Sequence, residues 1–232
     1  MKSTKIEWCD ATVNPVVGCT KGCAYCYARR LNQRFQWIED FSIPQFSPGR
    51  LRQLSTKKPK RIFMNSMSDI ADWKSEWMNE TLSEIHKNPQ NRYLFLTKRP
   101  GGYLPWTQFK AEYIWCGITV TSDKELDSRD LDMMRIIEET GDSLNWFYSI
   151  EPMLGPVNIS LAAQRGLKWV ILGAETGNRK GKVSPSLLWI RDVVDAADEA
   201  GIPVFMKNSL KGIMPDNEFR TEFPKGLQLE KK

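Results

Sequence analysis

Three cysteines near the start of the chain are the residues best suited to chemistry. Cys19, Cys23 and Cys26 are spaced as C-x3-C-x2-C in the segment GCTKGCAYCY, residues 18–27. A cubane iron–sulfur cluster held by three thiolates keeps one iron open to an outside ligand, whereas electron-transfer clusters usually take four cysteines. The spacing therefore predicts a [4Fe-4S] cluster whose free iron can bind a substrate or cofactor.

A structural zinc site is the alternative interpretation of these cysteines. Cys9 could supply a fourth thiolate, but structural zinc is usually held by two separated C-x2-4-C or H-x3-5-H pairs, which the compact triplet does not resemble. The single histidine, His86, lies in an amphipathic helical stretch, where a surface or core role is expected. Cys116 lies in an apolar run, so we expect a small buried hydrophobe there.

Length and composition indicate an ordinary folded protein. The 232 residues are 41% hydrophobic and 26% charged and include nine tryptophans, close to globular averages. A chain of this length forms one sizeable core, so we expect a single domain over residues 1–232. Five cysteines do not pair evenly, and neither a membrane span nor a secretory signal is visible. We therefore expect a cytoplasmic protein with no membrane partner.

The elements that must position the cysteines alternate between strand and helix. Most strand candidates are near-continuous apolar runs, such as YLFL at 93–96 and WVIL at 169–172, as in parallel strands buried on both faces. The strands are expected at 12–18, 61–65, 92–97, 114–121, 145–150, 168–173 and 203–207, and the helices at 24–35, 76–87, 123–139 and 185–200. The last helix has Ser184 as its N-cap, Pro185 at its first position and Gly201 at its end.

This alternation predicts an α/β fold, namely a partial or full parallel βα barrel of the TIM-like type. Residues 36–60 break the rhythm and are expected to form an irregular basic insertion between the first helix and the second strand. Residues 41–68 contain six cations and no acidic residue: Arg50, Arg52, Lys57, Lys58, Lys60 and Arg61. Such a run contacts nucleic-acid phosphates in some proteins and is a solvated loop in others, and both interpretations stay open.

Polar residues follow almost every predicted strand. In a βα barrel the active site is built at the C-terminal ends of the strands, although ordinary loop surface accounts equally well for some of these positions. The strand-end residues are Asn65, Ser66, Ser68, Asp69, Thr97, Lys98, Arg99, Thr119, Thr121, Glu151, Glu175, Lys207 and Asn208.

With Tyr25 directly before the third cysteine, the motif C-x3-C-x-aromatic-C resembles the signature of the radical S-adenosylmethionine (radical SAM) superfamily. More narrowly, the chain resembles a phage-associated three-Cys-motif family. The landmarks are IEW at 6–8, NP at 14–15, LTKRP at 96–100, EPMLGP at 151–156 and GAETG at 173–177. The same resemblance leads us to expect a hydroxyl residue in place of Cys9, which weakens Cys9 as a cluster ligand.

The resemblance implies a radical SAM barrel with a [4Fe-4S] cluster on Cys19, Cys23 and Cys26. S-adenosylmethionine (AdoMet) would chelate the open iron, and an electron donor such as flavodoxin or ferredoxin would reduce the cluster. Reductive cleavage would give methionine and a 5′-deoxyadenosyl radical that abstracts hydrogen from the substrate.

The residues expected to contact AdoMet are Tyr25, Ser66, Lys98, Thr119, Glu151 and Glu175. Tyr25 would lie near the adenine. Lys98 or Arg99 could pair with the methionine carboxylate, and Glu151 or Glu175 could accept hydrogen bonds from the ribose. No residue is assigned a catalytic role toward the substrate.

The leading functional hypothesis is modification or repair of a nucleotide or nucleic acid, favoured by the basic segment and by aromatic residues that could stack on bases. One alternative is a radical SAM enzyme acting on a small metabolite or peptide. Another is a non-catalytic, zinc-containing nucleic-acid-binding module. If the chain is phage-encoded, the compartment expected is the host cell cytoplasm.

Overall fold

The apolar runs of the sequence form the strands of the computed structural model, which describes residues 4–106, 110–140 and 144–229. Seven strands form one sheet in the order β1-β4-β5-β6-β7-β8-β9. Their bounds are Ala11–Thr12 (β1), Arg61–Phe63 (β4), Arg92–Thr97 (β5), Ile114–Thr119 (β6), Asn145–Ile150 (β7), Val170–Leu172 (β8) and Val204–Met206 (β9). The pairs β1–β4, β4–β5, β7–β8 and β8–β9 are parallel. The predicted α/β fold is confirmed in its partial-barrel form, since β1 and β9 end the strand order.

Burial of the strands explains why their sequences are apolar throughout. Every residue of β6, β8 and β9 is buried, as expected for parallel strands covered on both faces. Cys116 in β6 is 0% exposed, which confirms its interpretation as a small buried hydrophobe.

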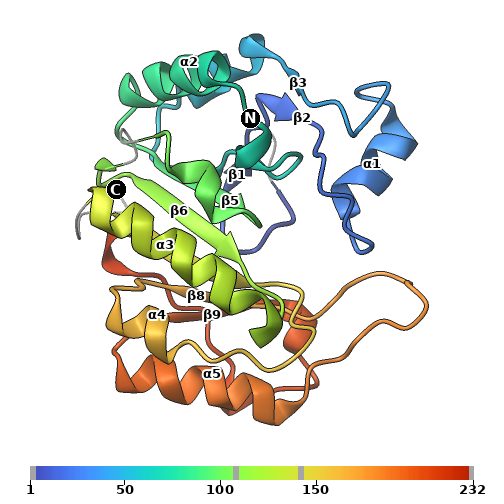
Figure 1. Ribbon diagram of the computed structural model, residues 1–232, viewed down its shortest axis with the longest axis vertical. Coiled ribbons are helices and arrows are strands. Elements are labelled where there is room, and N and C mark those ends of the chain that lie inside the picture. Colours follow the sequence, from blue (N-terminus) through green and yellow to red (C-terminus); the bar gives the residue numbers. More distant parts are fainter. Residues whose placement is uncertain (1–3, 107–109, 141–143, 230–232) are drawn as a thin grey trace. The chain divides into compact units, whose positions relative to one another are not determined.

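The chain divides into two compact units, residues 1–115 and 116–232. The first unit contains helices α1 (Tyr27–Phe35) and α2 (Ser75–His86) (Figure 1). It also contains a small antiparallel sheet of β2 (Val16–Val17) and β3 (Gln45–Phe46). The predicted first strand over 12–18 is therefore wrong in part, because the segment supplies β1 to one sheet and β2 to another. Pro15, which has no backbone N–H, lies between them and cannot donate to a ladder.

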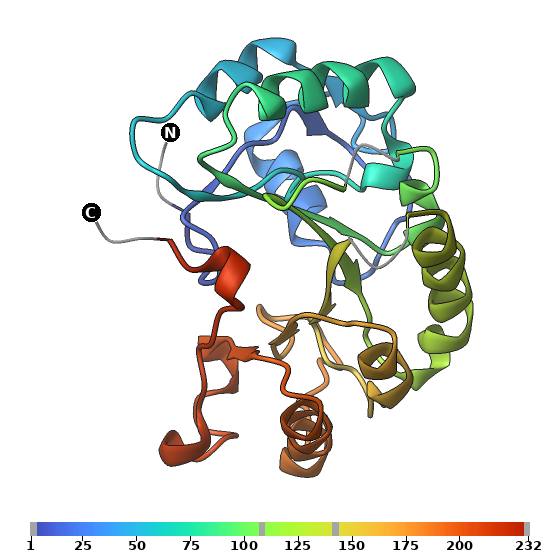
Figure 2. The ribbon, with the colours of Figure 1, turned by 90° about the vertical axis from the view of Figure 1, so that its left-hand side faces the viewer.

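The predicted insertion at 36–60 is more ordered than its sequence indicates. Besides β3 it contains a 3-10 helix, Pro48–Leu54, whose Leu51 and Leu54 are buried. This helix lies beside α2 (Figure 2). Arg50 in the same helix donates to the carbonyl of Asn14 at 2.8 Å, so one cation of the basic run has a structural role.

The second unit contains helices α3 (Leu126–Thr140), α4 (Ser160–Gln164) and α5 (Leu187–Glu199), with α4 beside α5 (Figure 1). Helix α5 begins later than predicted. Its N-cap is Ser186 instead of Ser184, and the Ser186 hydroxyl accepts from the N–H of Trp189 at 3.2 Å. Gly201 follows the helix as predicted, with a φ of 65° that glycine adopts without a Cβ penalty.

Among the described residues, His86 and Cys9 are not part of a group of three or more His, Cys, Asp and Glu side chains that could hold a metal ion. A ring nitrogen of His86 lies 2.7 Å from the hydroxyl of Tyr113, in the surface role expected of it. Cys9 is buried, and burial raises the pKa of its thiol to about 12. Within residues 4–106, 110–140 and 144–229, no helix is long and apolar enough to cross a membrane.

Candidate cluster and cofactor site

The cysteine loop, residues 18–26, connects β2 to α1. It begins at Gly18, where φ is 115° and an added Cβ would lie 2.7 Å from the Cα of Pro44. Only glycine permits this close approach. The N–H of Gly18 donates to the carbonyl of Met67 at 3.0 Å, and the N–H of Cys19 donates to the carbonyl of Phe41 at 2.7 Å. The backbone at the first cysteine is therefore held from two sides.

The third cysteine is the N-cap of α1, which explains why this helix begins at Tyr27 and not at Ala24. The Sγ of Cys26 accepts from the N–H of Arg29 at 3.4 Å. The Sγ of Cys26 thus satisfies one of the N–H groups that a helix leaves free at its N-terminus. The guanidinium of Arg29 also donates to the carbonyl of Cys19 at 3.3 Å, which links the first and third cysteine positions.

The three cysteines have the donor chemistry of an iron–sulfur cluster, but their side chains are not gathered. Among the described residues, no group of three or more His, Cys, Asp and Glu side chains is arranged to hold a metal ion. Burial, with a further contribution from Asp69 and Asp72, raises the pKa of the Cys19 thiol to about 11. Binding of a metal ion at Cys19 would therefore release a proton. Three soft sulfur donors on one loop fit a cluster with one open iron.

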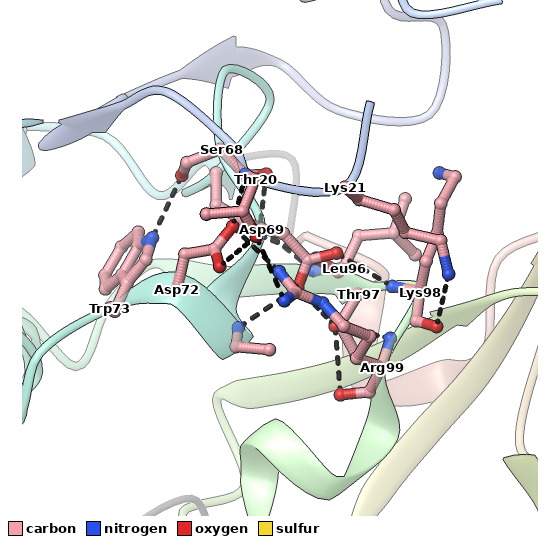
Figure 3. A network of polar contacts seen from close by, with 12 residues as sticks. Thr20, Lys21, Ser68, Asp69, Asp72, Trp73, Leu96, Thr97, Lys98 and Arg99 are labelled. Carbon is pink, nitrogen blue, oxygen red and sulfur yellow. Dashed lines mark hydrogen bonds and ion pairs between the residues drawn. The ribbon is translucent and has the colours of Figure 1, made fainter. Parts of the chain in front are cut away.

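A polar network joins the cysteine loop to the ends of β4 and β5 (Figure 3). Asp72 accepts from both the N–H and the hydroxyl of Thr20, at 3.0 and 2.8 Å. The Nη2 of Arg99 lies 2.7 Å from Asp72 Oδ2, and its Nη1 donates to the Thr20 hydroxyl at 3.3 Å. An aspartate and an arginine thus hold the residue that directly follows Cys19.

Asp69 extends this network from β4 to β5 (Figure 3). Its carboxylate accepts from the hydroxyl of Thr97 at 2.6 Å and from the N–H of Lys98 at 3.0 Å. From the sequence, Asp69 is predicted only as a strand-end residue, and Arg99 as a strand-end residue that could pair with the methionine carboxylate. No role is predicted for Thr20 or Asp72. The sequence did contain a signal for this network, namely an Asp-x-x-Asp pair after one strand and a cation after the next. The ends of neighbouring parallel strands lie at one edge of a sheet, so these side chains could have been expected to meet.

Three of the residues predicted to contact AdoMet lie close to the cysteine loop. The ammonium of Lys98 lies 5.8 Å from the ring centroid of Tyr25. The carbonyl of Ser66 accepts from the hydroxyl of Tyr27 at 2.6 Å, and the Ser66 hydroxyl donates to the side chain of Asn14 at 3.0 Å. Because the Ser66 hydroxyl already has a partner, its role as a direct cofactor contact stays a prediction.

The other three predicted residues belong to the second unit. Glu151, after β7, forms an ion pair with Lys207, after β9. Gly173, after β8, lies between them, and a Cβ there would be 3.2 Å from both Glu151 Cγ and Lys207 Cδ. A side chain at Gly173 would therefore press on the pair. The pair therefore engages the carboxylate of Glu151, one of the two residues predicted as possible acceptors from the ribose.

Glu175 and Thr119 differ in how their polar atoms are used. Glu175 is 5% exposed, and its two oxygens accept from Arg179 at 2.6 and 2.7 Å. Those hydrogen bonds lower the pKa of Glu175. The hydroxyl of Thr119 is buried and has no hydrogen-bond partner among the described residues, and the same holds for Ser149 on the next strand. A buried hydroxyl without a partner carries a desolvation cost that a bound ligand could relieve.

Stability at acidic pH is expected to depend on Asp10 and Asp72. Burial alone would raise the pKa of both carboxyls. Hydrogen bonds outweigh this effect and hold each pKa below its usual value of 3.8. The donors are Arg61 for Asp10, and Arg99 and Thr20 for Asp72. A carboxyl with a depressed folded-state pKa adds stability above its unfolded-state pKa, and loses it as pH falls through the folded-state value. Urea titrations should therefore give an unfolding free energy that declines below about pH 4. A free energy that increases on acidification in this range would contradict the assignment.

Solved structures of spore photoproduct lyase share this fold. A cysteine-to-serine variant aligns with a TM-score of 0.60 over 89% of this chain and 79% of its own, at 12% identity. A tyrosine-to-phenylalanine variant gives 0.60 over 88% and 78%, at 10% identity. A double variant with bound AdoMet and dinucleoside spore photoproduct gives 0.54 over 85% and 63%, at 11% identity. The likeness is one of fold, to a radical SAM enzyme.

At the level of sequence, no curated protein matches this chain significantly. One family model matches residues 3–222, a range that includes the cysteine loop and all the strands. The narrower resemblance to a phage-associated family stays a prediction. The chain belongs to the family described as Protein of unknown function (DUF5131).

Proposed function

We propose that this protein is a radical SAM enzyme that modifies or repairs nucleic acid. The observation that carries the proposal is the C-x3-C-x-aromatic-C loop, anchored beside the ends of β4 and β5 in a chain with the fold of spore photoproduct lyase. When bound, the cluster and AdoMet would supply an electron and a 5′-deoxyadenosyl radical. Cys19, Cys23 and Cys26 would hold the cluster.

The residues of this chain would bind and orient the cofactor. Lys98, whose ammonium lies over Tyr25, is the better partner for the methionine carboxylate, because Arg99 is paired with Asp72. The buried hydroxyl of Thr119 would gain a hydrogen-bond partner. Glu175 is paired with Arg179 and Glu151 with Lys207, so either carboxylate would accept from the ribose through a lone pair that its cation leaves free. We propose that residues 1–232 act together as one radical SAM domain, reduced by a flavodoxin or ferredoxin.

DNA is the substrate class that we place first. Spore photoproduct lyase is a DNA-repair enzyme, and one of its structures holds a dinucleoside photoproduct. In this chain the exposed cations Arg52, Lys57 and Lys58 are available for phosphate contacts. The second candidate substrate is a small metabolite or peptide. In that case these cations would only be solvated side chains on the surface of the loop.

The direct test is anaerobic reconstitution with iron and sulfide, followed by incubation with AdoMet and a reductant. We expect an iron–sulfur absorption band and the formation of 5′-deoxyadenosine and methionine. A colourless protein that retains one zinc ion and leaves AdoMet intact would refute the proposal and support the zinc-containing binding module. If the cluster forms, salt-dependent binding to oligonucleotides separates the nucleic-acid substrate from the small-molecule alternative.

A further inference from the structure

Two aromatic side chains are stacked on each other at the surface where α1 ends. The rings of Phe35 and Trp37 have centroids 5.3 Å apart and planes inclined by 21°. Phe35 is 51% exposed and Trp37 is 45% exposed. Exposed large apolar groups that lie together mark binding sites more often than isolated ones do. We call Phe35, Trp37 and the adjacent Arg34 the aromatic platform.

The chain holds this platform in place at a conformational cost. Gln36, between the two rings, has a φ of 49° and is the one non-glycine residue with positive φ among the described residues. Its N–H donates to the carbonyl of Asn32 at 2.7 Å. The buried side chain of Asn32 then clamps Ile38, accepting from its N–H at 3.1 Å and donating to its carbonyl at 2.8 Å. A strained residue persists only where its surroundings enforce it, and such residues cluster at ligand sites.

The charge around the platform favours an anionic partner with flat rings. The guanidinium of Arg34 lies 5.2 Å from the centroid of Phe35. Helix α1 contains three arginines and no acidic residue. Two acidic residues, Glu39 and Asp40, follow the platform. The carboxylate of Asp40 accepts hydrogen bonds from the N–H and the hydroxyl of Ser42. Stacked aromatic rings beside arginines form the platforms on which single-stranded nucleic acids place their bases.

We propose that the aromatic platform binds unpaired bases of single-stranded DNA, an inference that rests on the function proposed above. Helix α1 has Cys26 at its N-cap and Phe35 as its last residue. At 1.5 Å per residue the platform lies about 13 Å along the helix axis from the third cysteine. A single DNA strand whose bases stack at 3.4 Å intervals spans this length with about four nucleotides. The platform would thus fix a strand a few nucleotides from the cysteine loop.

The test is binding of a fluorescent oligo-dT of about 12 nucleotides, within the range of single-strand site sizes, measured by anisotropy on the full chain. The Phe35→Ala/Trp37→Ala variant should lose at least about tenfold in affinity, the effect of removing one or two base stacks. Trp37→Phe keeps an aromatic face and should bind nearly as tightly as wild type. The matched control, Leu161→Ala/Leu188→Ala, removes two exposed apolar side chains of the second unit and should leave affinity unchanged.

Other arms of the experiment identify the partner. Arg34→Gln should make the salt dependence of binding shallower by about 0.7 in slope, the value for one phosphate contact on a single strand. Tighter binding to duplex DNA or to oligo-U RNA than to oligo-dT would overturn the inference. Wild-type affinity in the double alanine variant would also overturn it.

Failure of this inference can be told apart from failure of the proposed function. Both double variants keep all three cysteines and should form 5′-deoxyadenosine from AdoMet at the wild-type rate without substrate. If the wild type cleaves AdoMet but binds no oligonucleotide at low salt, the platform is not a DNA site and the radical SAM proposal stands. If the wild type binds oligo-dT through the platform but cleaves no AdoMet, the platform is a DNA site and the radical SAM proposal fails.

Discussion

Replacing Cys23 by alanine is expected to abolish the iron–sulfur chromophore and the cleavage of AdoMet. With Cys23 removed, only two thiolates of the loop remain, and a cubane cluster with one open iron requires three. Cys23 lies in the exposed middle of the loop, where its side chain is only partly buried. The fold should therefore survive, and circular dichroism should match the wild type. Iron content, visible absorption and 5′-deoxyadenosine formation should all fall to background, and Cys19→Ala and Cys26→Ala should behave alike.

The chain offers two matched cysteine controls. Cys9→Ser introduces the hydroxyl expected at that position, and Cys116→Ala removes a sulfur from the buried strand β6. Both variants should keep the chromophore, because neither sulfur is expected to be a cluster ligand. A chromophore that survives in Cys23→Ala, or that disappears in Cys9→Ser, would show that the ligand set is different.

Replacing Asp72 by asparagine is expected to weaken both the fold and the cluster site. The change removes the charge that faces Arg99 and one of the acceptors for Thr20. Breaking charged hydrogen bonds of this kind costs about 1–3 kcal/mol of unfolding free energy, and the partial exposure of Arg99 places the value in the lower half of that range. Since Thr20 follows Cys19, reconstituted iron content should also fall. Urea titration and iron analysis measure the two effects.

The control for Asp72 is another carboxylate that pairs with an arginine. Glu218 accepts from Arg191 at 2.8 and 3.0 Å, but the pair lies at the surface, where Arg191 is exposed and Glu218 is partly exposed. Exposed ion pairs contribute little to stability, so Glu218→Gln should leave the melting temperature and the iron content close to wild type. Thr20→Ser keeps the hydroxyl that Asp72 binds and should retain the cluster. Full cluster content in Asp72→Asn would contradict the positioning role of the network.

Local pattern was sufficient to predict strands β4 to β9 of the sheet and the end of α5, but not the bounds of β1. Strands such as β5 and β7 were predicted at the residues where they occur, because uninterrupted apolar runs are stable only when both faces are buried. Gly201 marked the end of α5 because it adopts positive φ without a Cβ penalty. Helix α4 was missed, since five residues are too few to show a helical period.

The sequence by itself determined that three thiols lie close together on one segment, residues 19–26, because their spacing is a property of a short stretch of chain. It could not determine which polar residues hold that turn, because those come from strands far apart in sequence. Thr20 meets Asp72 across 52 positions, and Arg99 meets Thr20 across 79. The parallel pairing of β4 and β5 brings Asp72 and Arg99 to one edge of the sheet. The hydrogen bond from Gly18 to the carbonyl of Met67 brings Thr20 to the same edge. The stacking of Trp37 on Phe35 likewise depends on the left-handed Gln36 and the buried clamp of Asn32, which hydrophobic periodicity does not encode.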